Sequence, residues 1–174
     1  MIDLKDYDNA VIKFRKSLSF IMLPVISWDF YASNYEEIKQ TEKDVDSLLR
    51  IVSANSWNID TKIIDTKLKI DKNVVVVTDA KLNIVFATQN MWNMSQYRPE
   101  EIIGKSPKMF QGDLTSSTTL KIVSNAIKEK KPFEVTVVNY RKDGSTYKCW
   151  IQGQPVFDKK GDVVNFIAFE KEVA

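Results

Sequence analysis

The spacing of apolar residues changes near residue 73. Before that point, apolar side chains recur every three or four residues, which is the spacing of one helical face. A first helix is predicted from Val11, Phe14, Leu18 and Ile21, and Pro24 should end or kink it near Leu23. The amino-terminal third of the chain is therefore expected to be helical.

A second helix is predicted over residues 35–53, with Ser33 or Asn34 as its cap. Its apolar and β-branched positions repeat at heptad-like spacing, at Ile38, Thr41, Val45, Leu48 and Val52. Two or three heptads are too few to establish a coiled coil. The stripe therefore predicts either a helix packed on its own domain or the seam of a dimer. Residues 59–72 are polar with scattered isoleucines and are predicted to form a linker.

After residue 73, β-branched runs and turn signals replace the helical spacing. The predicted order is strands at 74–77 and 84–88, short helices at 90–95, 99–103 and 116–128, and strands at 133–141, 146–157 and 163–173. Asp143 and Gly144 predict a hairpin between two of the last strands. The order predicts an α+β fold, in which a five-stranded antiparallel sheet carries short helices on one face and follows an amino-terminal helical segment. We place the helical segment and linker at residues 1–69 and the sheet domain at 70–174.

Composition limits the chemistry that the chain can perform. Hydrophobic residues make up 44% and charged residues 28% of its 174 residues, and the net charge is +2. We therefore expect neither a nucleic-acid nor a membrane partner, and the lack of a signal-peptide pattern predicts a cytoplasmic protein. There is no histidine, which excludes Ser-His and Cys-His catalytic pairs and removes the usual axial ligand of haem. A single cysteine, Cys149, allows no internal disulfide. We expect no enzymatic activity.

Several motifs occur in the order found in one family of sensor domains. They are the strand and turn at 77–86, the tyrosine, proline-acidic and glycine-basic segment at 97–105, and the turns at 139–145 and 155–161. Through them, residues 70–174 resemble the PAS family, which implies the PAS fold and a sensory or interaction role.

Within PAS, residues 104–112 are similar to the signature of the flavin-binding LOV group. Gln111 and Gly112 match that signature, whereas Ser106 stands at its asparagine and Pro107 at its photoreactive cysteine. Proline has no thiol, so a covalent flavin adduct is not expected there. The cofactor, if any, is not assigned by the sequence, and haem is not expected.

The resemblance also implies positions for a ligand pocket. Asn139 matches a flavin-contacting asparagine, Cys149 replaces a second asparagine, and Glu170 replaces a glutamine near the flavin ring. A buried carboxylate is costly without a partner, so Glu170 should meet water or a hydrogen-bond donor. The candidate pocket residues are Trp92, Met94, Gln111, Val137, Asn139, Cys149 and Glu170.

The opposite face of the sheet is too apolar to stand in water. Its strand residues include Val138, Tyr140, Trp150, Ile167 and Phe169, and we expect the amino-terminal helices to cover them, in the same subunit or in a partner. The candidate interface residues are Ile38, Val45, Leu48, Val52, Tyr140, Trp150, Ile167 and Phe169.

These observations predict a stand-alone PAS sensor. It would bind a small ligand or a protein partner, form a homodimer, and signal through its amino-terminal helices to an output protein in trans. One alternative is a ligand-free dimerisation or scaffold module. Another alternative is a LOV-like domain that binds flavin without forming a covalent adduct.

Overall fold

The computed structural model describes residues 26–174, with side chains from Asn34 onward. The helix predicted from Val11 to Ile21 lies outside the described residues. The chain divides into two units, Met1–Glu37 and Ile38–Ala174, and the second contains the whole sheet. In the described residues, no helix is long and apolar enough to cross a lipid bilayer.

Five antiparallel strands form one sheet, in the order β2-β1-β5-β4-β3. The strands are β1 Val74–Asp79, β2 Ile84–Ala87, β3 Phe133–Tyr140, β4 Thr146–Phe157 and β5 Val163–Val173. The predicted strands are confirmed to within two residues at each end. The first and last strands of the sheet domain are paired with each other at its centre, with Val76 opposite Ala168.

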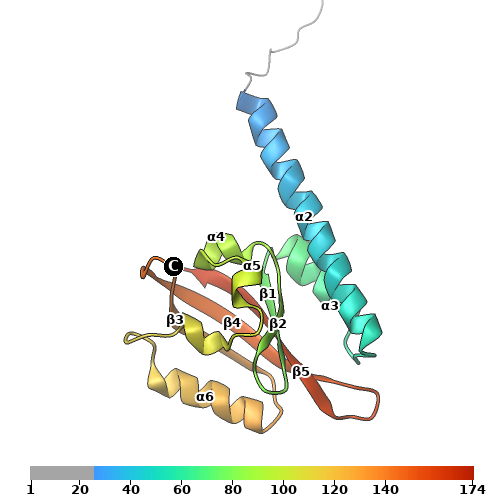
Figure 1. Cartoon of the computed structure of the whole chain (residues 1–174), viewed down its shortest axis with the longest axis vertical. Helices are drawn as coiled ribbons and strands as arrows, with labels where there is room; N and C mark the ends of the chain where they lie inside the picture. The colour runs from blue at the N-terminus through green and yellow to red at the C-terminus, as the bar shows by residue number, and fades with distance from the viewer. Residues whose placement is uncertain (1–25) are drawn as a thin grey trace, which may run out of the picture. The chain divides into compact units, whose positions relative to one another are not determined.

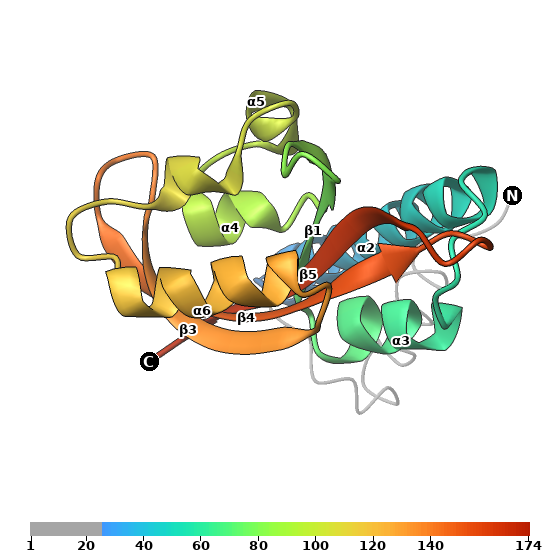
Figure 2. The ribbon, with the colours of Figure 1, turned by 90° about the horizontal axis from the view of Figure 1, so that it is seen from below.

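Three short α-helices and a 3-10 turn lie between β2 and β3. They are α4 Met91–Ser95, α5 Pro99–Ile102, η2 Pro107–Phe110 and α6 Ser117–Lys128. Pro99 and Pro107 each stand at the first turn of their helix, where a missing N–H costs nothing. Figure 2 shows α4 and α5 on one side of the sheet and α3 on the other. The first of these sides is called the inner face below, and the second the outer face.

From residue 26 onward, two helices and a π-turn precede the sheet. They are α2 Ile26–Ala54, α3 Thr61–Asp65 and η1 Thr66–Ile70. The prediction that α2 begins near Tyr35 is wrong, because the helix already includes Ile26 and continues through the expected cap. The predicted linker at 59–72 is also wrong. This segment forms helical turns, because burying Ile64 and Leu68 in the core with the sheet stabilises them.

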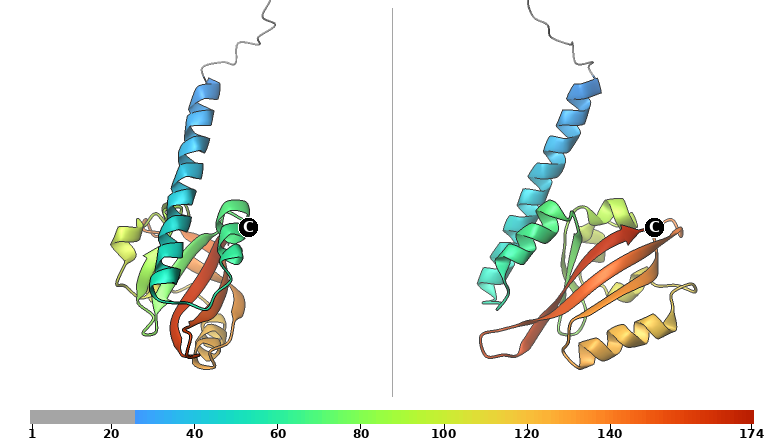
Figure 3. Two further views of the ribbon diagram at one scale, coloured as in Figure 1. Left: turned by 90° about the vertical axis from the view of Figure 1, so that its right-hand side faces the viewer. Right: turned by 180° about the vertical axis from the view of Figure 1, so that it is seen from behind.

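The outer face is covered by helices of the same chain (Figures 1 and 3). Their apolar side chains and those of the sheet form one core, made of Val45, Leu48, Val52, Trp57, Ile64, Leu68, Val75, Val77, Val156, Ile167 and Phe169. Asp44 of α2 adds a polar anchor, because its carboxylate accepts a 2.8 Å hydrogen bond from the backbone N–H of Gln89.

Candidate functional site

The inner face of the sheet gathers the polar residues that the sequence singled out. In the ladder, Glu170 of β5 lies opposite Val74 of β1 and Ile151 of β4. Residues paired across antiparallel strands point to the same side, and side chains alternate along each strand. Glu170 therefore faces inward, while its neighbour Phe169 belongs to the outer core.

Glu170 is a buried carboxylate with little compensation. Its side chain is 8% exposed, and its contact is the thiol of Cys149, whose Sγ lies 3.7 Å from Oε2. Burial, opposed only by that weak hydrogen bond, raises the pKa of Glu170 from its ordinary value of 4.5 to about 7. Near neutral pH, this side chain can therefore either accept or donate a strong hydrogen bond.

Cys149 lies beside it on β4, and Asn139 lies on the same face further along β3. Cys149 is fully buried, and burial together with the nearby Glu170 raises the pKa of its thiol far above the usual range. The thiol therefore stays protonated and is a poor nucleophile. Asn139 is 5% exposed and lies opposite Tyr147 in the ladder. Burial raises the pKa of Tyr147, so its phenol also stays neutral.

Towards the other end of the inner face, several apolar side chains are only half buried. The Phe133 ring lies on the backbone of Gly153, at a place that any Cβ at position 153 would overlap. Helix α6 contacts β3 but contains no fully buried residue. Its most protected apolar side chains, Leu120, Val123 and Ile127, stay half buried. This end of the inner face therefore keeps apolar surface that the fold itself does not bury.

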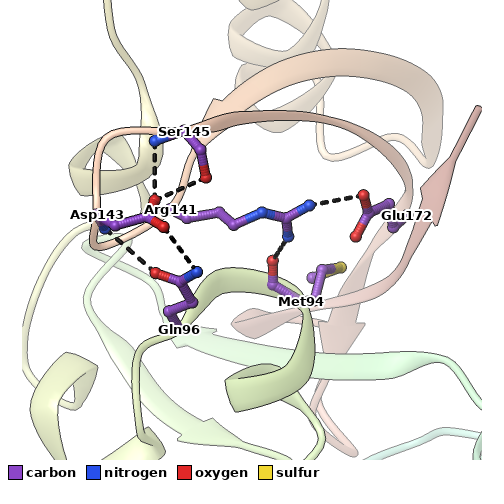
Figure 4. Close-up of polar contacts among 6 residues, drawn as sticks. All are labelled: Met94, Gln96, Arg141, Asp143, Ser145 and Glu172. Carbon is purple, nitrogen blue, oxygen red and sulfur yellow. Dashed lines mark hydrogen bonds and ion pairs between the residues drawn. The ribbon is translucent and has the colours of Figure 1, made fainter.

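At the opposite end of the inner face, the side chain of Arg141 contacts three other residues, Tyr147, Met94 and Glu172, and we call this group the arginine clasp (Figure 4). The guanidinium of Arg141 lies 4.6 Å from the ring centroid of Tyr147, donates to the backbone carbonyl of Met94, and forms a 2.7 Å ion pair with Glu172. The ion pair with Glu172 raises the pKa of Arg141. The clasp therefore ties the β3–β4 hairpin to the end of α4 and to the last residues of β5.

The tip of the same hairpin is also fastened to α4. Asp143 accepts a 2.9 Å hydrogen bond from Gln96 and two from Ser145, which lower its pKa to about 2. Lys142 pairs with Glu101 of α5. These contacts fix the hairpin over the end of α4 rather than leaving it free in solvent.

The structure brings together most of the predicted pocket residues but not all. Met94, Val137, Asn139, Cys149 and Glu170 are buried on the inner side of the sheet. Gln111 is half buried just after η2.

The predicted place of Trp92 in the pocket is wrong. Its side chain is 45% exposed and lies 5.4 Å from the guanidinium of Arg98, ring centroid to Cζ. One helical step is about 100°, so Trp92 points away when Met91 and Met94 face the sheet. It borders a surface hollow with Asn93, Gln96, Lys142 and Asp143 instead.

The predicted interface residues fall into two groups. Val45, Leu48, Val52, Ile167 and Phe169 all belong to the outer core of this chain, which accounts for their burial without a partner. The others are more open.

Ile38 is 53% exposed, and Trp150 is half buried with its indole N–H donating to Glu134. Tyr140 covers Gly112 and accepts a 2.9 Å hydrogen bond from the backbone N–H of Leu114. Dimerisation through any of them remains a prediction.

Sequence reasoning missed the clasp and the ring over Gly153. Arg141 lies within the turn motif at 139–145, but nothing in the motif shows that its guanidinium reaches α4 and β5. The close approach of Phe133 to Gly153 had one signal, a lone glycine inside a long strand, which often marks such a contact.

The described residues do not suit the cofactor chemistry of the LOV group. Pro107 begins η2 and offers no thiol, and Cys149 lies in the sheet with a pKa that keeps it protonated. No cluster of three or more metal-binding side chains occurs among residues 34–174.

Comparisons with a family model and with curated proteins point to the same family of domains. The PAS domain model matches residues 72–173. Among curated proteins, Protein TWIN LOV 1 of Arabidopsis thaliana is 37% identical over 92 residues, which are 52% of this chain and 23% of the relative. A blue-light photoreceptor of Listeria innocua is 30% identical over 102 residues, which are 57% of this chain and 40% of that protein. The chain thus spans less than half the length of these relatives.

Solved structures show the same likeness. The dark structure of the blue-light photoreceptor Aureochrome1 LOV superposes with a TM-score of 0.60 at 27% identity, covering 67% of this chain and 86% of that one. A light-oxygen-voltage domain studied with a flavin analogue also gives 0.60, at 25% identity, covering 64% and 85%.

Proposed function

Since the chain belongs to the PAS domain family, we propose that it is a sensory module whose inner sheet face binds a small molecule and whose outer helices pass the response to a protein partner. The observation that carries this proposal is Glu170, a buried carboxylate on the inner face with a thiol as its hydrogen-bond partner. Such a group costs several kcal/mol to bury, so a fold that keeps it supports a role in recognition.

The backbone gives a direct route from that face to the helices. Glu170 points inward, while Phe169 packs outward in the core that holds Leu48 of α2 and Leu68 of η1. Lys67 of η1 also lies over the Phe169 ring, at 5.8 Å from its centroid. A ligand that shifts or twists β5 at residue 170 therefore displaces the surface on which α2 and η1 rest. Packed cores respond to such shifts by repacking rather than by smooth deformation.

Native mass spectrometry of freshly purified protein, beside its absorbance spectrum, tests the ligand. We expect a mass excess that disappears in the Glu170→Gln variant and persists in Asp162→Asn, which removes an exposed carboxylate in the turn between β4 and β5. A visible absorbance band would identify a chromophore and favour the flavin alternative. Ligand sensing would be refuted if the protein had the mass of the bare chain, showed no absorbance band, and kept that mass after incubation with each small-molecule fraction of a cell extract. That outcome would favour a ligand-free scaffold.

A hydrogen-exchange comparison tests the transmission. Binding at the inner face should change the exchange rates of α2 and η1 amides as well as those of β5. A response confined to the inner face would contradict the proposed route while leaving the binding site intact.

A further inference from the structure

We infer that the inner face selects small aromatic molecules that carry a protonated amine, and that Glu170 is the group that binds this amine. The inference rests on the proposed sensory function and specifies the chemical class of its ligand. Three features of the described residues support it: the charge of the site, its apolar surface, and its adaptable side chains.

Above about pH 7, where Glu170 is mostly ionised, the inner face carries a negative charge that no described residue neutralises. Among the described residues, no cation contacts Glu170, and its hydrogen-bond donor is the weakly donating thiol of Cys149. Arg141 is a basic residue on this side of the sheet, but its guanidinium is already shared by Glu172, the Met94 carbonyl and the Tyr147 ring. Tyr147 and Cys149 are both neutral. Glu170 therefore keeps acceptor capacity for a ligand.

A carboxylate in this position discriminates strongly between ligands. A protonated amine would form a charge-assisted hydrogen bond with this buried carboxylate, where such a bond is stronger than in water. An anionic ligand would meet a like charge, and an acceptor without N–H groups would leave the carboxylate unpaired. Glu170 thus favours protonated amines over anionic ligands and over ligands without N–H groups.

The apolar part of the site favours a ring. Phe133 lies against Gly153 and is only half buried, so part of its ring surface stays uncovered. Leu120, Val123 and Ile127 of α6 also leave apolar surface half buried. An aromatic ligand would bury this surface and could stack on Phe133.

The helices on this side can adapt to a ligand. Met91, Met94 and Met109 all belong to the core between the inner face and the short helices. Methionine is unbranched, and it repacks around inserted groups more readily than the other apolar residues do. Entry of a small ring therefore requires side-chain rearrangement rather than unfolding.

The test uses matched trios of small molecules on the full chain. Indole, naphthalene and quinoline would each carry an aminoethyl, a hydroxyethyl or a carboxymethyl group. Binding is measured at pH 8, where Glu170 is mostly ionised and alkyl amines remain protonated, with an ordinary pKa of about 10. Titrations are followed by two-dimensional NMR, in which the side-chain amide of Asn139 and the amide of Cys149 report binding at the inner face.

We expect each amine to bind at least about tenfold more tightly than the alcohol with the same ring, and the carboxylate to bind most weakly. In Glu170→Gln, the ratio of amine to alcohol affinity should fall to within about threefold, because the charge is lost while the shape is kept. In Asp162→Asn, which removes an exposed carboxylate in the turn between β4 and β5, the ratio should be unchanged.

The outcomes separate this inference from the proposed function. Equal affinities for amine and alcohol, or preference for the carboxylate, would overturn the ligand class while showing that the inner face binds small molecules. Retention of amine preference in Glu170→Gln would overturn the role of Glu170. Failure of all nine compounds to shift the inner-face resonances would overturn the inference, and the native mass of the purified protein would then decide the proposed function by itself.

Discussion

Replacing Glu170 by glutamine should stabilise the protein, and the gain should grow with pH. The glutamine side chain would resemble the protonated acid in shape but cannot ionise. In the unfolded chain, Glu170 ionises with its ordinary pKa of 4.5, whereas in the folded chain burial raises that pKa to about 7. Between these two values the unfolded state loses a proton that the folded state keeps. The wild-type protein therefore loses stability as the pH rises through this window.

The magnitude follows from the two pKa values. One pH unit of pKa difference corresponds to about 1.4 kcal/mol, so the full penalty on folding is about 3 kcal/mol. At pH 4 the wild type and Glu170→Gln should differ by only a few tenths of a kcal/mol, at pH 6 by about 2 kcal/mol, and at pH 7 to 8 by about 3 kcal/mol. Such a gain is a large share of the stability of a typical domain.

Urea unfolding followed by tryptophan fluorescence, at four pH values from 4 to 8, measures this difference. Other groups that titrate in this range, including Asp44, contribute equally to both proteins and cancel in the comparison. The Glu172→Gln variant is the control, because it removes an exposed carboxylate that is paired with Arg141 and should give a small loss without the same pH dependence. A difference between Glu170→Gln and wild type that stays constant from pH 4 to 8 would refute the reasoning. It would mean that Glu170 ionises in the folded protein as readily as in water.

Three further predictions concern the core and the thiol. Leu48→Ala empties a fully buried position between α2 and the sheet, and it should lower the free energy of unfolding in urea by about 2 to 5 kcal/mol. The control Ile38→Ala changes an exposed position and should lower it by less than about 0.5 kcal/mol. Equal effects of the two variants would contradict the packing of α2 on this chain. Gly153→Ala should lower the free energy of unfolding by about 1 to 3 kcal/mol, because the added methyl group displaces the Phe133 ring. In a double-mutant cycle, adding Phe133→Leu should restore part of that loss. Strictly additive effects of the two substitutions would show that the ring does not contact position 153. Cys149 should resist Ellman's reagent in the folded protein at pH 8 and react fully in urea, because its thiol is buried with a raised pKa; rapid labelling without denaturant would place the thiol within reach of solvent.

Much of the fold was available from the sequence because its signals are local. The β-branched run at Val74, the Asp143-Gly144 turn and the prolines at helix starts each act within a few residues, and the strand ends followed from them. The length of α2 did not follow, since Asn34 is a good cap in isolation but stands inside a continuous helix. The segment at 61–70 looks like a linker in the sequence because its two buried residues, Ile64 and Leu68, become meaningful only against the sheet.

For the candidate site, alternation along the strands was enough to place Asn139, Cys149 and Glu170 on one face. The rotation of a single-turn helix was not predictable in the same way, and Trp92 therefore came out on the exposed side of α4. The partners of Arg141 lie 47 residues before it and 31 residues after it in the chain. No local pattern encodes contacts of that kind, because they depend on the finished sheet.

The central pairing of β1 with β5 sets the order in which the domain can form during synthesis. Val75 and Val77 have no partners on one side until Ile167 and Phe169 have been made, and the apolar stripe of α2 has only part of its surface to pack on until then. Four strands and every helix described here are therefore synthesised before the strand that completes the outer core. A nascent chain in this state exposes the apolar face of α2 together with an unpaired edge of β1, which is the combination that chaperones bind and that aggregation exploits.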